Sequence, residues 1–534
     1  MEENHSIKTG NSELEKKIQM LLGSVSKQSW IALVSAFAIG ILDYMYMFTN
    51  RFLTFDSMWN MYSDQDMITS GRQFLKWACG ISSYFDLPAV NGILAILYLS
   101  VTAAILVHIF EIKGYFASVL AGGIFVTFPA ISSAFCYTYT IDGYMLAVLI
   151  TTIAFVLMDR YRFGWIPAIL LIGFSLGVYQ AYYPFLIIIC VLKLITDLLR
   201  ENDLKPILKK VLRYVLAGVG GYLFYAVSLK IMLSARGLSL SGYQGSDKVL
   251  GFDLREVPVN CYKAARNFFS FVFSMNILTA TRAMKYGLII LFLIAAVSFI
   301  YLLVVRRVYK KPVRILLIAL LLFCVPTLSS LAMVMAPEGY LHVMLRLPWS
   351  LFFLYAIFLV ERAAESLESG SKEALKKVSL IACCVFSACV IIMIEQFFVM
   401  QGIVAFNMQE KYEKTYYLCQ SLMERLDQQE EYRFGDPVTI IGGKRDPNRY
   451  PSTSITEWIV GWYLGVNGEL CVGSTEQFEA FTAHYLGVAF VIADDATTAQ
   501  IAQTKEYEEM KAYPDADCIQ RINGVWTIKL TNTN

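Results

Sequence analysis

Charged residues are scarce in this sequence of 534 residues, at 16%, and their signs nearly cancel to a formal net charge of +2. Nucleic-acid-binding proteins usually carry a strongly basic face, so this balance argues against that class. Histidine occurs only 4 times, and the 11 cysteines form no CxxC motif or Cys/His cluster. A structural zinc site is therefore not expected.

The short motifs of several enzyme classes are also missing. The sequence contains no glycine-rich phosphate loop, no HExxH motif and no Ser/His/Asp pattern. These absences argue against a cytosolic nucleotide as the substrate. A secretory signal is not expected either, because the polar segment 1–28 precedes the first apolar run.

Apolar residues dominate what is present. Hydrophobic residues make up 57% of the chain, aromatic residues 14%, and the mean hydropathy is +0.52. These values are typical of a polytopic α-helical membrane protein, in which each span needs about 20 apolar residues. We predict about eleven spans. They cover approximately 30–48, 89–110, 115–135, 139–158, 165–179, 182–199, 214–233, 286–305, 315–335, 347–359 and 378–400. The stretch 165–199 could instead be one broken helix, because Pro184 interrupts it.

The connecting segments predict the orientation, because cytoplasmic loops carry an excess of Lys and Arg. Every second segment is basic, which places the amino-terminal segment 1–29 in the cytoplasm. The segments 50–88, 234–285 and 336–346 then face outward, as does everything after the last span. The residues behind this prediction are Lys16, Lys17, Lys27, Lys113, Arg160, Arg162, Lys205, Lys209, Lys210, Arg213, Arg306, Arg307, Lys310, Lys311, Arg314, Lys372, Lys376 and Lys377.

Two regions outside the spans have structure of their own. The stretch 254–273 interleaves basic and apolar residues and predicts an amphipathic helix at the membrane surface. After the amino-terminal segment 1–29, we divide the chain into a membrane domain, 30–400, and an extracytoplasmic α/β domain, 401–534, of about 130 residues. In the latter we predict strands at 437–441, 490–493 and 525–530, and helices at 406–429 and 496–510. A disulfide could join two of the outer cysteines Cys79, Cys419, Cys471 and Cys518.

The loop 50–86 collects acids, one arginine and aromatic residues beside the membrane. Such a set can bind a sugar and activate a hydroxyl group. Asp56 is the candidate general base because it lies just beyond the first span, at the height of a lipid-linked phosphate. The alternatives are a solvated loop acid or a helix cap.

Two further features of this loop could bind a substrate. Asp64-Gln-Asp66 matches a DxD pattern, which can hold a divalent cation, although simple surface polarity explains the same letters. Arg72 offers a planar fork of donors suited to phosphate. Its alternative is an ion pair with Asp56 or Asp64.

Distant segments supply the other candidate binding residues. Tyr182 could present an aromatic face to a sugar, and Gln180 lies at the same turn, where structural hydrogen bonding is its alternative. Arg346 lies near the outer end of a span. A cation there either reaches toward the lipid headgroups or meets an anionic substrate.

The order of motifs resembles a known family. A first span, then DSMWNMYSDQD, SGRQF, a second span and later LGVYQAYYPF are similar to the type II branch of the Gtr glucosyltransferases, polytopic enzymes of the GT-C class. The resemblance covers about 30–400 and fades in the carboxyl-terminal region. It implies a GT-C-like fold and transfer of glucose from a polyprenyl-phosphate carrier to a cell-surface glycan, on the outer face of a bacterial cell membrane.

The resemblance also implies roles for single residues. Asp56 matches the essential acid of the first outer loop, and Gly71 and Arg72 match the family's Gly-Arg pair. Family members often have paired acids where this chain has Phe55-Asp56-Ser57, so a second acid is missing or is supplied by Asp64 or Asp66. No cofactor is implied beyond the divalent cation considered above.

A transporter or flippase of lipid-linked sugars is the alternative function. It could use the same cations and aromatic residues without chemistry. Transporters tend to show internal repeats and helices broken near the bilayer midplane. We find no convincing repeat, and the polar groups gather at the outer surface instead.

Overall fold

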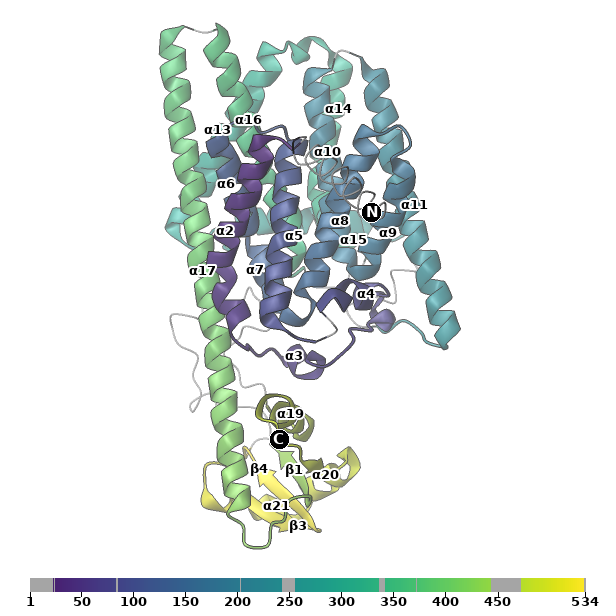
Figure 1. Ribbon diagram of the computed structural model, residues 1–534, viewed down its shortest axis with the longest axis vertical. Coiled ribbons are helices and arrows are strands. Elements are labelled where there is room, and N and C mark those ends of the chain that lie inside the picture. Colours follow the sequence, from purple (N-terminus) through teal and green to yellow (C-terminus); the bar gives the residue numbers. More distant parts are fainter. Residues whose placement is uncertain are drawn as a thin grey trace, which may run out of the picture.

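A computed structural model describes residues 23, 25–82, 85–201, 203–242, 255–335, 341–370, 372–442 and 472–532. Long helices form a bundle, and a small α/β region lies beyond one end of it (Figure 1). Most of the amino-terminal segment 1–29 and part of the loop 336–346 lie outside the described residues. The protein is a multi-pass helical membrane protein with a small carboxyl-terminal α/β region.

Every predicted span coincides with an apolar helix or helix pair. Among the described residues, 9 helices are long and apolar enough to cross a membrane, or 10 if one bent pair is a single span. The remaining predicted span is a shorter helix of 14 residues. These helices are α2 (Lys27–Thr49), α5 (Pro88–Ile109), α6 (Tyr115–Val126), α7 (Pro129–Phe135), α8 (Ile141–Arg160), α9 (Trp165–Val178), α10 (Tyr183–Arg200), α11 (Leu204–Arg236), α13 (Arg282–Val305), α14 (Pro312–Ser329), α16 (Ser350–Gly370) and α17 (Glu373–Asp427).

The chain changes direction within one predicted span and between two others, for different reasons. The bent pair α6 and α7 changes direction by 44° where Pro129 starts α7, because proline cannot continue the hydrogen-bond ladder of the preceding helix. Helices α9 and α10 form a hairpin around the turn η4 (Gln180–Tyr182). Lys210 contacts both Asp159, shortly before α9, and Asp197, near the end of α10, at 3.1 and 2.6 Å. The stretch 165–199 is therefore two antiparallel helices rather than one broken helix.

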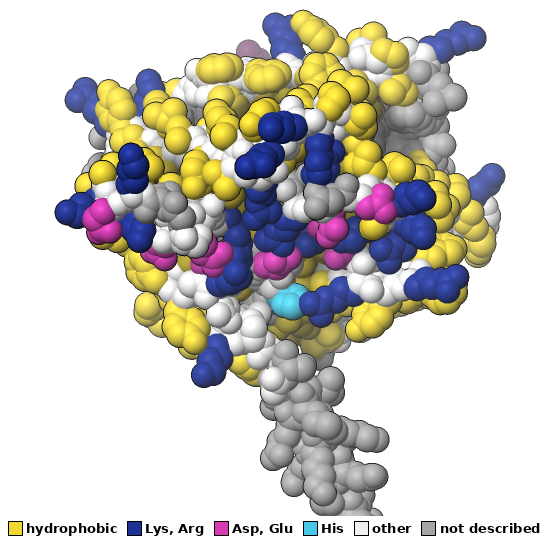
Figure 2. All heavy atoms as spheres, turned by 90° about the horizontal axis from the view of Figure 1, so that it is seen from above, with side chains coloured by type: hydrophobic (Ala, Val, Ile, Leu, Met, Phe, Trp, Pro, Cys, Tyr) yellow, Lys and Arg dark blue, Asp and Glu magenta, His cyan; other side chains and the backbone are white. Residues whose placement is uncertain are grey.

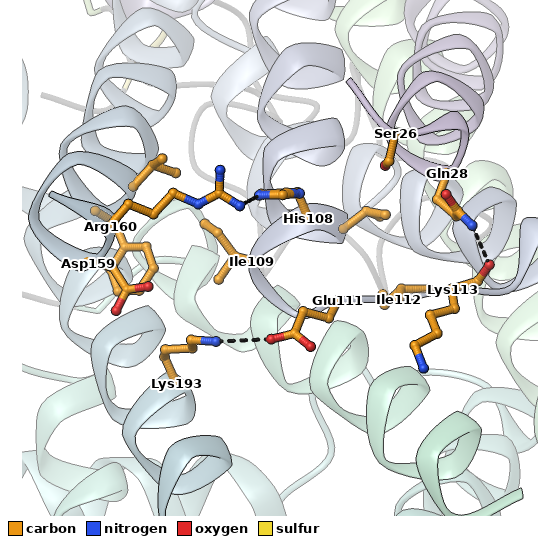
Figure 3. Close-up of a pocket in the computed structure, with 13 residues that line it drawn as sticks. Ser26, Gln28, His108, Ile109, Glu111, Ile112, Lys113, Asp159, Arg160 and Lys193 are labelled. Carbon is orange, nitrogen blue, oxygen red and sulfur yellow. Dashed lines mark hydrogen bonds and ion pairs between the residues drawn. The ribbon is translucent and has the colours of Figure 1, made fainter. Parts of the chain in front are cut away.

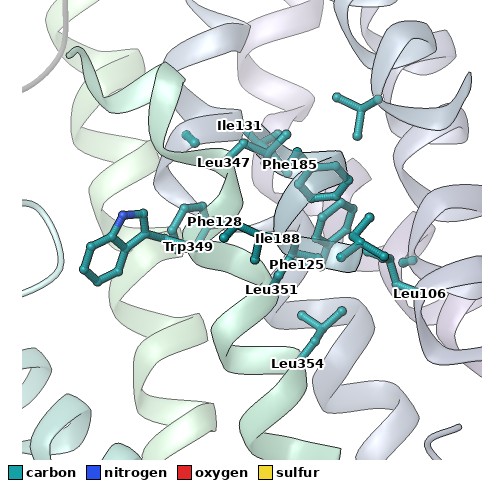
Figure 4. Close-up of a cluster of buried hydrophobic side chains, with 14 of the residues drawn as sticks. Leu106, Phe125, Phe128, Ile131, Phe185, Ile188, Leu347, Trp349, Leu351 and Leu354 are labelled. Carbon is teal, nitrogen blue, oxygen red and sulfur yellow. The ribbon is translucent and has the colours of Figure 1, made fainter. Parts of the chain in front are cut away.

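The centre of the bundle is packed with aliphatic and aromatic side chains. Phe125, Phe128, Phe185 and Leu351 belong to its largest buried cluster (Figure 4). Apolar side chains are also abundant on the outside, as at Leu316 and Phe323, which are 69% and 81% exposed. A surface of this kind suits lipid, because lipid tails are as apolar as the side chains themselves.

The short elements connect the spans on the side of the bundle nearest the α/β region, where α3 and α4 are seen (Figure 1), and we call this side the α3 end. The predicted amphipathic helix is present there as α12, although its membrane-surface location stays a prediction. These elements are α3 (Phe55–Asn60), η1 (Ile68–Ser70), α4 (Leu75–Cys79), η2 (Gly80–Ser82), η3 (Thr138–Thr140), η4, α12 (Val257–Phe273), α15 (Ala332–Met335) and η7 (Val343–Trp349), whereas η6 (Val308–Lys310) lies between α13 and α14.

The carboxyl-terminal α/β region has a four-stranded sheet in the order β2-β1-β4-β3. Strand β1 (Pro437–Ile441) pairs in parallel with β2 (Val491–Ile492) and β4 (Val525–Lys529), and β3 (Ile519–Ile522) is antiparallel to β4. The three predicted strands are confirmed. The predicted helix 496–510 is two helices, because Thr504 caps a new one. Around the sheet lie α19 (Thr475–Phe481), the π-helix η8 (Thr482–Leu486), α20 (Asp495–Ala502), α21 (Lys505–Glu509) and η9 (Ala516–Cys518).

The boundary predicted at residue 400 is not a structural break. The last span and the helix predicted at 406–429 form one continuous helix, α17, of 55 residues. The cysteines Cys79 and Cys518 are free and buried, and Cys419 is buried as well. Cys471 lies outside the described residues, so a disulfide involving it stays untested.

Candidate functional site

Asp56 lies in the first turn of α3 at the α3 end of the bundle. The helix begins there because Thr54 and Ser57 form a capping box, in which each side chain bonds the other residue's amide nitrogen, at 3.1 and 2.9 Å. Thr54 is therefore the cap, and the helix-cap alternative for Asp56 is wrong. The acid is still well placed electrostatically, because a helix N-terminus favours negative charge.

Two cations act on Asp56 from different parts of the chain. Part of the residue is exposed, yet surrounding protein displaces enough water to raise the pKa of its carboxyl group, while Arg72 and Lys411 oppose that rise. Lys411 comes from α17 and is fully buried. Sequence reasoning missed it, because it lies in a stretch whose letters predict only an ordinary helix.

Arg72 is oriented by tyrosines and by a tight turn. Its Nη1 donates to the hydroxyl group of Tyr144 at 3.1 Å, and its guanidinium lies 4.8 Å from the ring centre of Tyr179. Asp64 is engaged by Lys76 instead. Of the two proposed ion-pair partners of Arg72, Asp56 interacts with it electrostatically.

Gln180 holds the turn that precedes Arg72. Its side-chain amide donates to the carbonyl oxygen of Gly71 at 2.6 Å and to the hydroxyl oxygen of Tyr225 at 2.9 Å. Gly71 has a φ of +75°, which favours glycine. These contacts match the structural hydrogen bonding considered for Gln180, and substrate binding by it stays a prediction.

Tyr182 belongs to a group of three packed tyrosines. Tyr144 stacks on Tyr179 at 4.6 Å between ring centres, and Tyr182 meets Tyr179 edge-on at 5.2 Å. Tyr182 is buried, and its hydroxyl group has no hydrogen-bond partner among the described residues. Beside Asp56 lies a further tyrosine, Tyr137, whose pKa is raised chiefly by burial.

The two acids of the DxD pattern are already paired. Lys76 forms an ion pair with Asp64 and lowers the pKa of its carboxyl group, and Arg236 Nη1 lies 2.5 Å from Asp66 Oδ2. Within the described ranges, no three His, Cys, Asp or Glu side chains are arranged to hold a metal ion. The surface-polarity alternative fits these contacts, while substrate binding by the two acids stays a prediction.

Arg346 lies in η7, which packs against η4 and therefore lies beside the tyrosine group. Its Nη2 donates to Asn267 Oδ1 of α12 at 3.0 Å, and its guanidinium lies 3.7 Å from the ring centre of Phe271. The side chain is buried rather than directed toward lipid headgroups. The elements that carry Asp56, Arg72, Tyr182 and Arg346 thus come together at one end of the bundle.

An apolar groove begins next to this arginine. It has a volume of about 290 Å³ and lies between α10, α12, α13, α14 and α16. Its wall includes Phe268, which neighbours Asn267 and stacks on Trp349 at 4.6 Å. Almost all the exposed lining is apolar, including Ala296, Phe299 and Leu322.

The opposite end of the bundle holds a second cavity of about 320 Å³. Seen from that side, many Lys and Arg side chains lie on the surface, with a smaller number of Asp and Glu side chains among them (Figure 2). In the cavity, Lys193 binds Glu111 at 3.3 Å, and Arg160 contacts His108 (Figure 3). Arg200, which is not one of the lining residues, also binds Glu111, at 2.5 Å. These paired charges tie helices together, so this cavity is the weaker candidate for a reaction site.

Comparison with models of known protein families gives a match. The model of a family described as "Glucosyl transferase GtrII" matches residues 45–360, which is more than half of the chain. None of the curated proteins compared with the chain matches it. The matched range contains Asp56, Arg72, Gln180, Tyr182 and Arg346, but not Lys411 or the α/β region.

Proposed function

Because the chain belongs to the GtrII glucosyl transferase family, we propose that it transfers glucose from a polyprenyl-phosphate carrier to a hydroxyl group of a cell-surface glycan. The transfer takes place on the outer face of a bacterial cell membrane, where Asp56 acts as the general base. The observation that carries this proposal is the meeting of Asp56, Arg72 and the tyrosine group at the end of a membrane bundle.

The chemistry assigns a separate task to each charged group. The Asp56 carboxylate takes the proton of the acceptor hydroxyl while that oxygen forms a bond to the anomeric carbon of glucose. The bond from this carbon to the phosphate oxygen breaks, and the carrier phosphate leaves with the electron pair. Arg72 and Lys411 stabilise the negative charge of that phosphate. A single displacement of this kind inverts the anomeric carbon.

The tyrosines and the raised pKa of Asp56 support the same assignment. Tyr144, Tyr179 and Tyr182 offer flat faces and hydroxyl groups for a sugar. The raised pKa of Asp56 makes its carboxylate a stronger base than that of an ordinary aspartate.

The apolar groove supplies a route for a lipid-linked donor. An isoprenoid chain could lie along α13 and α14 in the groove, entering from the membrane rather than from solution. Arg346, next to the groove wall at Phe268, would then meet the phosphate on its way to Arg72.

A substitution that blocks the groove with a bulky side chain tests whether the donor enters through it. Ala296 is exposed and lines the groove, so Ala296→Trp should block it without disturbing the core. Val297 is 59% exposed on the same helix and does not line the groove, which makes Val297→Trp the matched control. We expect a raised KM for labelled polyprenyl-phosphate glucose in the first variant only, and equal KM values would reject the groove as the donor route.

The function itself is tested with radiolabelled glucose on the carrier lipid. Membranes containing the native chain should move label from the lipid to a glycan acceptor. Movement of intact lipid-linked glucose across the bilayer without transfer would instead show a transporter. Label appearing on an acceptor only at the basic, cytoplasmic end would contradict the proposed orientation.

A further inference from the structure

Helix α3, which carries Asp56, is too short to be stable by itself. It has 6 residues, whereas isolated helices shorter than about 12 residues are marginal in water. Its position must therefore come from tertiary contacts. The bundle supplies one side of these contacts, and the carboxyl-terminal α/β region supplies the other (Figure 1).

Two side chains of the π-helix η8 bond directly to α3. His484 Nδ1 lies 2.6 Å from the carbonyl oxygen of Met58, and because a carbonyl only accepts, this nitrogen carries the proton. That carbonyl is near the end of α3, where helices lack internal partners. The hydroxyl groups of Tyr485 and Ser57 are 3.2 Å apart.

Apolar burial adds to these hydrogen bonds. Leu53 and Met58 are both 0% exposed, and they belong to one buried cluster with Leu422, Phe478 and Phe481. This cluster is separate from the main core of the bundle. The segment around α3 is thus part of the hydrophobic core of the α/β region.

The contacts determine which way Asp56 points. Residues on a helix are separated by about 100° of rotation, so Asp56 lies about 200° from Met58, on the opposite side of α3. Docking Met58 and Ser57 onto η8 therefore directs Asp56 away from the α/β region, toward Arg72 and Lys411.

We propose that His484 and Tyr485 are positioning residues, which hold α3 so that Asp56 faces Arg72. The α/β region is then a structural part of the transfer site, although it lies outside the segment that matches the family model. The consequence for transfer rests on the proposed function, whereas the docking of α3 does not.

The test compares variants of the full-length chain in detergent. His484→Ala removes the donor, and His484→Asn keeps one, because its amide nitrogen can occupy the place of Nδ1. Tyr485→Phe removes the hydroxyl group, and Tyr513→Phe is its matched control, since Tyr513 makes a like contact of 3.2 Å with Ser421 within the α/β region. Thermal midpoints check that each variant folds.

Two readouts are measured. Hydrogen–deuterium exchange of residues 54–61 should be about fivefold faster in His484→Ala, and near the native rate in His484→Asn. The kcat for glucose transfer should fall about tenfold in His484→Ala with little change in KM, and should recover in His484→Asn. Tyr485→Phe should show a smaller loss of kcat, and Tyr513→Phe none.

The outcomes separate this proposal from the proposed function. Native exchange rates in His484→Ala would overturn the docking of α3. Faster exchange with an unchanged kcat would overturn the positioning role. If the native chain transfers no glucose, the proposed function fails and positioning for transfer fails with it, while the exchange rates still decide whether η8 holds α3.

Discussion

Replacing Gly71 by alanine should disable the turn that aims Arg72. The residue has a φ of +75°, which costs a residue with a Cβ atom about 1 kcal/mol or more. An added Cβ atom would also lie 2.6 Å from Gln180 Nε2 and 2.7 Å from Tyr225 Oη. Both groups are held by the turn's own hydrogen bonds, so moving them loses about 1 kcal/mol for each bond. The local cost is then about 3 kcal/mol, the sum of about 1 for the backbone and about 2 for the bonds.

A matched control separates backbone strain from the loss of this packing. Gly237 has a φ of +64° and no atom within 4 Å of an added Cβ atom, so Gly237→Ala carries only the backbone cost of about 1 kcal/mol. We expect Gly71→Ala to lower glucose transfer about 100-fold, because small displacements of a catalytic group are that costly, and Gly237→Ala to leave it near native. The assay is the initial transfer rate in membranes at equal protein content, together with the thermal midpoint in detergent. Equal transfer rates in the two variants would refute the assigned role of the turn.

Three further predictions concern charge. Arg72→Met should lower kcat about 100-fold and Arg72→Lys less, since lysine keeps the charge but not the planar fork; equal losses in the two variants would contradict a contribution from the charge itself. The acid limb of kcat/KM should lie above the ordinary range of aspartate, because the pKa of Asp56 is raised, and Lys411→Met should move it to higher pH by removing a charge that lowers this pKa; a limb that moves to lower pH would contradict this. Asp86 is buried with a pKa of about 6, so its ionisation costs stability as pH rises from about 4 to 6. Asp86→Asn should therefore raise the free energy of unfolding near neutral pH by ~3 kcal/mol at most, and the thermal midpoint with it, but not near pH 4; an equal gain at both pH values would exclude this cause.

The spans could be predicted because the thickness of the bilayer limits the length of apolar runs. The hairpin of α9 and α10 could not be distinguished from a broken helix, since Pro184 is compatible with both. Proline is tolerated in the first turn of a helix, and that is where Pro184 lies in α10. The continuity of α17 was missed because the composition of the sequence changes at residues 400–406, and we took that change as a boundary. These residues contain no helix-breaking proline, so the helix can continue through them.

The candidate site could be predicted only where its residues adjoin the first outer loop. Asp56 and Arg72 are in that loop, but Tyr144 lies 72 positions from Arg72 in the sequence, and His484 lies 426 positions from Met58. Such contacts leave no periodic signal in one sequence. The DxD pattern shows a second limit, because its conspicuous acids are engaged by Lys76 and Arg236, and the pattern alone does not reveal these ion pairs.

The most direct test of Asp56 as the general base is the transfer rate of Asp56→Asn with saturating polyprenyl-phosphate glucose and acceptor. Asparagine keeps the size of the side chain but cannot take a proton, so we predict a loss of at least about 100-fold in kcat with native expression. Asp203→Asn is the control, because Asp203 caps α11 and asparagine caps equally well. A native rate of transfer in Asp56→Asn would contradict the assignment.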